Sequence, residues 1–315
     1  MVRFAFVFMK GIVIKSTGSW YSVLTESGEK IECRIKGKLR IKGIKSTNPV
    51  TVGDSVIFEP EGKNEGIISE IEPRKNYILR RSINLSKQTH IIAANIDQAL
   101  LIISLCSPKT LKGFIDRFLI TAEAYSIPVI LVFNKIDLYS DSDKKEMEYL
   151  KSVYKKIGYR CIESSVKTGQ NLDIIKEVLT DKKTLLSGNS GVGKSSLINV
   201  IEPNLNLKVS EISASHQTGK HTTTFAEMHP LSFGGFVIDT PGIKSFGIVD
   251  FHKEELYHYF PEFFRLSSQC KFHNCIHINE IQCAVKEATK TDVIAPFRYD
   301  NYLKLYYGED LEGEY

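Results

Sequence analysis

Residues 188–196 are the stretch of this sequence whose residue types and spacing most directly suggest chemistry. They read G-N-S-G-V-G-K-S-S and match the pattern G-x-x-x-x-G-K-[ST] at every position. Apolar residues before and after the stretch predict a buried strand, a glycine-rich turn and a helix, which is the context that this pattern requires. Glycines let backbone amides approach phosphate oxygens, and the helix N-terminus adds partial positive charge. We expect Lys194 to reach the β- and γ-phosphates of a nucleotide and Ser195 to bind Mg²⁺. The other predicted phosphate contacts are Gly188, Asn189, Ser190, Gly191, Val192, Gly193 and Ser196.

A second group of polar residues, Asn134, Lys135 and Asp137, follows the apolar run at 129–133. In this N-K-x-D pattern, the Asp carboxylate can accept hydrogen bonds from N1–H and from the exocyclic amine of guanine. Adenine offers no such pair of donors and would leave the carboxylate unpaired. We expect Asn134 to bond near N7 and O6 of the base and the Lys135 stem to lie over the ring. With the phosphate loop, this pattern predicts a site for a guanine nucleotide.

The stretch S-S-V-K-T-G at 164–169 follows a strand-like segment. It resembles the S-A-K loop of GTPases, whose backbone closes over the base, and this resemblance assigns Ser165 and Val166 to the nucleotide site. A serine before a helix is often only an N-cap, here for the helix that we expect at 171–179.

The segment from 210 to 229 is polar and has no regular hydrophobic period. After a phosphate loop, such a segment is typical of a switch that becomes ordered around the γ-phosphate and Mg²⁺. One residue of its T-T-T run is expected to complete the Mg²⁺ coordination, and we favour Thr223. The following G-F-V-I-D-T-P-G predicts a strand and a D-x-P-G turn. In that turn Asp239 would hold Mg²⁺ through water and the Gly242 amide would sense the γ-phosphate.

The segments that must position these groups alternate between buried strands and helices. Continuous apolar runs at 99–104 and 129–133, with helical spacing between them, are typical of a parallel sheet covered on both faces. We therefore predict a doubly wound α/β P-loop GTPase domain over residues 81–250. Its N-K-x-D and S-A-K loops precede the phosphate loop, so the domain is circularly permuted. The same pocket can still form, because all these loops lie at the carboxyl ends of neighbouring strands.

Residues 1–80 contain about five short strand patterns separated by turn signals, which predicts an all-β barrel of the OB type. Residues 1–81 hold 15 Lys/Arg and 9 Asp/Glu, a net of +6 in a chain whose net charge is +4. The stretch 31–42 alternates with period two, so that its cations share one face. Such a face is either a solvated edge strand or a contact surface for a phosphate backbone. We favour RNA, because the strand 2–3 face of OB barrels binds oligonucleotides. The predicted RNA contacts are Arg34, Lys36, Lys38, Arg40 and Lys42.

The third predicted domain, residues 251–315, is mostly helical and contains the spacing C-x4-C-x-H-x5-C. Its members are Cys270, Cys275, His277 and Cys283, with His273 as a competing source of the imidazole. Three thiolates and one imidazole suit a closed, tetrahedral and therefore structural Zn²⁺ site. The other three of the six cysteines are scattered singly, which favours a metal site at 270–283 over a set of buried thiols.

The composition excludes several classes of protein. The chain has 315 residues, of which 42% are hydrophobic and 25% charged, and no apolar run is long enough to span a membrane. The cysteines do not form a disulfide framework, so we expect a reducing cytoplasm. The apolar start at 1–9 continues into a strand pattern without a cleavage site, which indicates an extension or first strand rather than a signal peptide. Nothing in the sequence suggests an oligomer, and we expect a monomer.

The order of the motifs resembles that of the circularly permuted GTPases of the RsgA/YjeQ family. The stretches A-N-I-D-Q at 94–98, D-R-F at 116–118 and G-K-H-T-T-T at 219–224 carry the same resemblance, which covers nearly the whole chain. It implies a GTPase that depends on the small ribosomal subunit and acts late in its maturation. The implied partners are that subunit, its rRNA, GTP and GDP. The resemblance also implies that His277 supplies the imidazole to the metal.

The residue that would orient the attacking water is not the usual one. Many GTPases have a glutamine directly after D-x-x-G, where this chain has Ile243, so we expect slow intrinsic hydrolysis. The resemblance implies a catalytic role for His221, although a lone histidine is often a surface or capping residue. Two alternatives to the ribosomal GTPase stay open. One is a GTP-regulated protein that binds another RNA, such as tRNA; the other is a binding module with a structural nucleotide.

Overall fold

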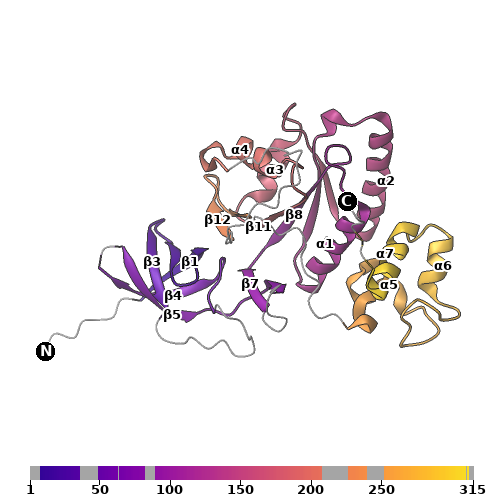
Figure 1. The fold of residues 1–315 in the computed structure, drawn as a ribbon, viewed down its shortest axis with the longest axis horizontal. Helices are drawn as coiled ribbons and strands as arrows, with labels where there is room; N and C mark the ends of the chain where they lie inside the picture. Colours follow the sequence, from indigo (N-terminus) through magenta and orange to yellow (C-terminus); the bar gives the residue numbers. More distant parts are fainter. Residues whose placement is uncertain are drawn as a thin grey trace.

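The computed structural model describes residues 8–35, 49–62, 64–81, 89–207, 226–239, 252–309 and 311. A β-barrel lies at one end of the molecule, an α/β sheet with its helices in the middle, and a group of short helices at the other end (Figure 1). This arrangement confirms the predicted fold class. In the parts described, none of the helices combines the length and the hydrophobicity that a membrane crossing needs.

The barrel is built from five strands: β1 (Met9–Ser16), β2 (Tyr21–Thr25), β3 (Lys30–Ile35), β4 (Ser55–Glu61) and β5 (Glu65–Ile71). It closes because β1 pairs with both β2 and β4, while β5 joins β3 to β4. Alternate side chains point inward, as the period of a strand requires. The fully buried members of this core include Val13, Val23, Cys33, Phe58 and Ile68.

A two-stranded antiparallel sheet connects the barrel to the centre of the molecule, and it spans the predicted boundary at residue 80. Its strands are β6 (Tyr77–Arg81) and β7 (Thr89–Ala94). Beside it, Arg74 binds the fully buried carboxylate of Asp54 through two nitrogens, each 2.6 Å from a carboxylate oxygen. The backbone segments at Gly53 and Ala94 lie close together, because a Cβ on Gly53 would be 2.1 Å from the Ala94 carbonyl oxygen.

The central sheet has the order β10-β9-β8-β11-β13-β12. Every neighbouring pair is parallel except β12 with β13. The strands are β8 (Gln98–Ile103), β9 (Val129–Phe133), β10 (Arg160–Glu163), β11 (Lys183–Ser187), β12 (Glu227–Pro230) and β13 (Phe236–Asp239). The edge strand β12 also pairs with β1 of the barrel, at Glu227 and Lys15, so that one sheet runs through both domains.

Helices cover both faces of this sheet, because successive strand residues point to opposite sides. On one face, Leu101 and Leu131 pack against α1 (Lys112–Ala124) and α2 (Asp141–Ile157). On the other, Leu100 and Val132 pack against α3 (Leu172–Leu179) and α4 (Lys194–Ile201). Helix α2 begins with a capping box, in which Ser140 and Asp143 each accept a hydrogen bond from the other's backbone amide. Burial on both faces explains why the strands read as continuous apolar runs.

The C-terminal part consists of short helical elements around an aromatic core. They are η3 (Lys253–Tyr259), α5 (Pro261–Ser267), α6 (Ala284–Lys290) and α7 (Pro296–Tyr307). The segment before the cysteines is thus a 3-10 helix followed by a short α-helix. The break falls at Pro261, which has no amide hydrogen to continue a helix but suits a first helical turn.

A buried ionic network joins this C-terminal part to the central domain. Arg298 is fully buried and donates to Asp116 of α1 (2.6 Å) and to Glu262 of α5 (2.7 Å). Asp116 also accepts hydrogen bonds from Asn301 (2.6 Å) and Tyr154 (2.8 Å). The network supplies hydrogen-bond donors to both carboxylates, of which Asp116 is fully buried and Glu262 nearly so.

Replacing Arg298 by Leu should therefore destabilise the protein strongly. The variant leaves two carboxylates buried without a cation, and removing one partner of a buried ion pair costs about 3–5 kcal/mol. Chemical denaturation would measure the change in the free energy of unfolding. The matched control is Lys290→Leu, because Lys290 pairs with Glu287 on the exposed surface of α6, where pairs are worth about 0–1 kcal/mol. A loss no larger than that of the control would contradict the role given to the network.

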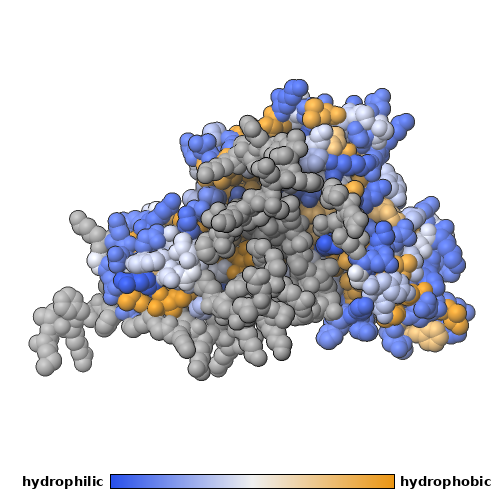
Figure 2. All heavy atoms as spheres, viewed as in Figure 1, coloured by the Kyte–Doolittle hydropathy of each residue, from blue (hydrophilic) through white to orange (hydrophobic). Residues whose placement is uncertain are grey.

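Large hydrophobic side chains are exposed at both ends of the molecule. They include Phe8 and Trp20 in the barrel and Phe264, Ile281 and Val293 in the C-terminal part. Figure 2 shows hydrophobic residues in separate groups among hydrophilic ones at these two ends.

Candidate functional site

The predicted nucleotide-binding residues follow neighbouring strands at one edge of the central sheet. Asn134 comes directly after β9, Ser164 after β10 and Gly188 after β11, while Asp239 is the last residue of β13. Because these strands are parallel, their carboxyl ends lie at the same edge, where α/β sheets bind ligands. The permuted order of the motifs therefore does not separate them in space.

The backbone angles and close contacts of the phosphate loop require glycine at positions 188 and 193. Gly188 and Gly193 have φ angles of +139° and +97°, which favour a residue without a side chain. A Cβ on Gly188 would lie 2.1 Å from the Ile102 carbonyl oxygen, and one on Gly193 would lie 2.6 Å from Nδ2 of Asn134. The loop thus packs against both β8 and the N-K-x-D segment.

The Lys194 ammonium group lies folded over the phosphate loop. Its Nζ donates to the carbonyl oxygens of Gly188 (2.7 Å) and Asn189 (2.8 Å). Burial lowers the pKa of Lys194, and the negative charge of Asp239 opposes that shift. A cation held among backbone carbonyls in a partly buried position is well placed to exchange those carbonyls for phosphate oxygens.

Asn134 links the N-K-x-D segment to the phosphate loop. Its Nδ2 donates to the Val192 carbonyl (2.9 Å), and its Oδ1 accepts from the Ser164 hydroxyl (3.0 Å). The side chain is 1% exposed, so its orientation is set by these two bonds. Ser164 was not among the predicted site residues. It begins the S-S-V-K-T-G stretch, but only the structure shows that it lies opposite Asn134.

Asp137 is oriented by Ser165, whose hydroxyl donates to Oδ1 of the carboxylate at 2.6 Å. Ser165 also accepts a hydrogen bond from the Thr168 amide (3.2 Å), so the loop is closed on itself. A pocket of about 350 Å³ lies between Asp137 and helix α2, which lines it with Lys144, Met147 and Glu148. The residues of the phosphate loop do not line this pocket. Lys135 donates to the Ser107 carbonyl at 2.5 Å, a contact that the sequence did not predict.

Replacing Ser165 by Ala should weaken the binding of a guanine nucleotide about tenfold. The substitution removes a hydrogen bond to a charged group, worth about 1.5 kcal/mol or more, and frees the Asp137 carboxylate to rotate. Titration calorimetry with GTP would measure the dissociation constant. Ser142→Ala is the control, because that serine is exposed in the first turn of α2. Equal affinities of both variants would show that Ser165 does not orient Asp137.

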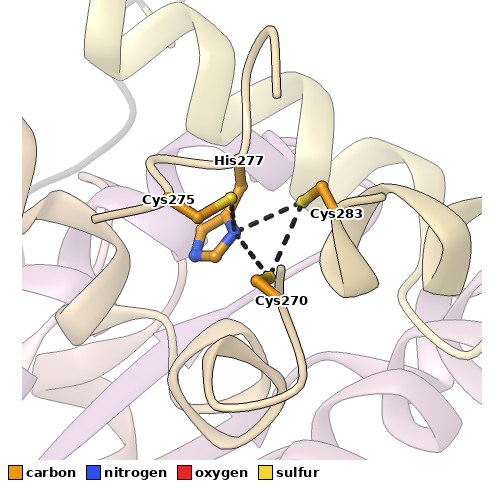
Figure 3. A group of neighbouring side chains, drawn as sticks. All are labelled: Cys270, Cys275, His277 and Cys283. Atoms are coloured by element: carbon orange, nitrogen blue, oxygen red, sulfur yellow. Dashed lines mark hydrogen bonds between the residues drawn. The ribbon is translucent and has the colours of Figure 1, made fainter. Parts of the chain in front are cut away.

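The four predicted metal ligands lie together in the C-terminal part, with their ligand atoms within 4.8 Å of one another. Nδ1 of His277 is 3.4 Å from the sulfurs of Cys275 and Cys283 and 3.6 Å from that of Cys270 (Figure 3). In a tetrahedral zinc site with ordinary bond lengths, ligand atoms are about 3.6–3.8 Å apart. The competing candidate, His273, is exposed and is not part of this group. The donor set and its spacing therefore fit zinc.

The backbone around His277 holds the imidazole toward the sulfurs. His277 has a φ of +63°, and the Glu280 carboxylate accepts hydrogen bonds from the amides on either side of it, Ile276 (2.7 Å) and Ile278 (2.9 Å). Tyr299 donates to the His277 carbonyl at 2.7 Å. Burial lowers the pKa of His277 to about 4, which keeps the ring neutral, as a metal ligand must be.

The thiols of the group depend on a cation for their ionisation. Burial raises the pKa of Cys275 to about 12, and burial raises the pKa of Cys283 as well. Without a metal these side chains would be neutral thiols, whereas zinc binds thiolates. Among the described residues, the buried Nε2 of His277 has no hydrogen-bond partner. The ring packs edge-on against Tyr257, with 4.8 Å between ring centroids.

Several predicted site residues lie outside the described part of the chain. They are His221, Thr223 and Gly242 of the nucleotide site and Lys36, Lys38, Arg40 and Lys42 of the proposed RNA face. Of that face, Arg34 is described: it is exposed, 3.6 Å from Glu65, with its guanidinium 4.7 Å from the centre of the Trp20 ring. Roles for these residues stay predictions.

Comparisons with known proteins agree with the resemblance that the motifs suggested. The model of the RsgA GTPase family matches residues 71–249, and that of the RsgA N-terminal domain matches residues 10–68. A protein of Christiangramia forsetii is 56% identical over 305 residues, which are 96% of this chain and 97% of the relative. One of Bacteroides fragilis is 52% identical over 307 residues, 98% of this chain and 99% of the relative. Both are named small ribosomal subunit biogenesis GTPase RsgA.

Two crystal structures share the whole architecture. YjeQ from Thermotoga maritima has a TM-score of 0.79 at 36% identity, covering 98% of this chain and all of that one. YloQ, described as a circularly permuted GTPase, has a TM-score of 0.75 at 32% identity, covering all of both chains. The family model covers more than half of this chain, and the relatives match it almost from end to end. The chain therefore belongs to the RsgA family of circularly permuted GTPases.

Proposed function

We propose that this GTPase acts late in the maturation of the small ribosomal subunit, that it binds the subunit and its rRNA in a GTP-dependent way, and that the subunit stimulates hydrolysis. The observation that carries the proposal is identity above half of all residues, over nearly the full chain, with relatives named for small-subunit biogenesis. Work on ribosomal subunits implies a cytoplasmic protein, and we expect it to act as a monomer.

The chemistry that we assign to the site is phosphoryl transfer from GTP to water. Asp137, Asn134 and Lys135 would hold guanine, with Ser165 and Val166 closing over it. The amides of the phosphate loop and Lys194 would bind the β- and γ-phosphates. Mg²⁺ would be held by Ser195 and Thr223 directly and by Asp239 through water, and when bound it neutralises developing negative charge on the phosphates. Zn²⁺ in the four-ligand group would be structural.

A path for coupling GTP to RNA binding lies in the continuous sheet. Asp239, Glu227 and Lys15 are direct partners across β13, β12 and β1, and Lys15 is in turn opposite Ser22 of β2. Lys15 and Glu227 also form an ion pair at 3.4 Å. Because partners opposite one another share a face of a sheet, a shift of β13 on hydrolysis would reach the barrel through this row.

His221 is our candidate for positioning the attacking water, since Ile243 cannot do so. Replacing His221 by Ala should lower subunit-stimulated hydrolysis at least a hundredfold, within the range of about 10²–10⁴ that a positioned acid–base group contributes. Affinity for GTP should change by less than a factor of three. Phosphate release with saturating subunits, alongside GTP titration, measures both quantities, and His229→Ala in β12 serves as the control. Unchanged stimulated turnover would remove His221 from the mechanism.

One experiment separates the proposed function from its alternatives. GTP turnover is measured alone, with purified small subunits, and with tRNA. Stimulation by the subunit supports the proposal, whereas stimulation by tRNA alone would favour a role on another RNA. Turnover that no RNA changes would contradict both, and no turnover would indicate a structural nucleotide. Co-sedimentation with subunits in nonhydrolysable GTP or in GDP then tests whether the nucleotide sets the affinity.

A further inference from the structure

The barrel presents an aromatic side chain that its own core does not use. Trp20 is the single tryptophan of the chain, lies in the turn between β1 and β2, and is 37% exposed. It does not belong to the hydrophobic cluster that fills the barrel. The turn is nevertheless ordered, because the amide and the hydroxyl of Thr17 both donate to the Trp20 carbonyl, at 3.0 and 3.2 Å. An ordered, partly exposed indole that lies outside the hydrophobic core of the described barrel is a feature of binding surfaces.

Arg34 adds a cation to the same place. Its guanidinium carbon is 4.7 Å from the centre of the Trp20 ring, within the range of a cation–π contact. The two residues meet because β2 and β3 are antiparallel and Tyr21 is paired with Cys33. Their chain neighbours Trp20 and Arg34 therefore lie opposite one another. Glu65 is 3.6 Å from Arg34, and both side chains are more than half exposed. Such a pair is weak in water and can be exchanged for a phosphate.

We propose that Trp20 and Arg34 form a stacking platform for an unpaired base of a single-stranded RNA segment. This inference rests on the proposed function, in which the partner is rRNA. A planar indole backed by a planar guanidinium offers a surface that fits a base, and base stacking on an aromatic side chain is worth about 1–3 kcal/mol. The platform also lies where OB barrels bind oligonucleotides, on the loop between the first two strands and on the face of strands 2 and 3.

The sequence around the platform favours RNA over an acidic protein segment. The described part of β3 ends at Ile35, and the sequence continues with four cations, Lys36, Lys38, Arg40 and Lys42. A sequence segment rich in cations attracts either kind of polyanion. A peptide of Asp and Glu, however, has no flat group to place on the indole, whereas every base has one.

The single tryptophan makes the test direct, because the intrinsic fluorescence of the protein at the tryptophan band reports on Trp20 alone. The full-length protein is titrated at low salt with a single-stranded RNA dodecamer, with a duplex of the same sequence and with poly-glutamate. We expect strong quenching by the single strand and little by the duplex or by poly-glutamate. Equal quenching by the duplex, or no quenching by the single strand at concentrations that bind, would overturn the proposal.

Variants distinguish stacking from simple exposure. Trp20→Leu should weaken binding of the labelled dodecamer about tenfold, while Trp20→Phe should keep most of the affinity. Arg34→Gln should weaken binding and reduce the dependence of log K on log salt by about one unit. The matched control is Phe264→Leu, which removes an aromatic ring of the C-terminal part that is 54% exposed. A far-UV circular dichroism spectrum and a thermal unfolding midpoint like those of the wild type verify that each variant is folded.

The outcomes separate this inference from the proposed function. If subunits stimulate wild-type turnover but Trp20→Leu binds RNA like the wild type, the platform is refuted and the ribosomal role stands. If subunits do not stimulate the wild type, the ribosomal role fails. Quenching by the single strand would still support the platform in that case.

Discussion

Replacing Asp137 by Asn should reduce the affinity for GTP by about three orders of magnitude. The carboxylate can accept two hydrogen bonds from guanine, and Ser165 holds it in position with a donor at 2.6 Å. An asparagine amide keeps one oxygen acceptor. Its NH₂ group, however, is a donor and would face an N–H donor of guanine. The loss of one charged hydrogen bond and the burial of an unsatisfied donor cost about 1.5–3 and 1–3 kcal/mol. Their sum is near 4 kcal/mol, or about a thousandfold.

The same substitution should raise the affinity for xanthosine triphosphate. Xanthine has a carbonyl oxygen where guanine has its amine, so it accepts from the new amide. Titrations of wild type and variant with GTP, XTP and ATP measure the change, and Asp141→Asn, in the exposed first turn of α2, is the control. If the variant kept its GTP affinity within a factor of three, Asp137 would not be the base-recognising group. Comparable binding of ATP and GTP by the wild type would lead to the same conclusion.

The positions of the predicted nucleotide-binding residues in the fold follow from the sequence, because each loop has its own local signal. A buried strand that ends in a short polar pattern predicts where Asn134, Asp137, Lys194 and Asp239 lie, and the parallel sheet brings these ends together. What the sequence did not predict are the contacts that fasten one loop to the next. Ser164 begins the S-S-V-K-T-G stretch, but that pattern does not predict its bond to Asn134, and Ser107 belongs to no pattern. Both roles depend on which backbone or side chain lies opposite.

The contacts between domains could not be predicted from the sequence either. The pairing of β1 with β12 uses backbone groups of two edge strands, and backbone groups are the same at every residue. The network of Asp116, Glu262 and Arg298 joins residues far apart in the chain, and each of them alone reads as an ordinary charged surface residue. Only the meeting of elements in three dimensions shows that Arg298 is buried.

Loss of the metal is expected to unfold the C-terminal part, and Cys275→Ala tests this outcome. The elements around the site are short: η3, α5 and α6 have seven residues each, too few to be stable alone. Structural zinc contributes about 10–16 kcal/mol of apparent binding free energy at pH 7, which is far more than these helices can supply. We expect the variant to lose its zinc and residues 252–309 to become sensitive to proteases.

The wild type should lose the metal on acidification, because protons compete with the metal for thiolate and imidazole ligands, so that affinity falls as pH falls. Metal content by atomic absorption and the pattern of limited proteolysis measure both effects. Cys161→Ala is the control, since that cysteine lies in β10 and outside the cluster. A variant at Cys275 with one zinc per chain and wild-type protease resistance would refute the assignment.

GTP affinity should survive in Cys275→Ala, because Asp137 and Lys194 lie in the central domain. A parallel loss of GTP binding would instead show that the Arg298 network makes the two domains unfold as one.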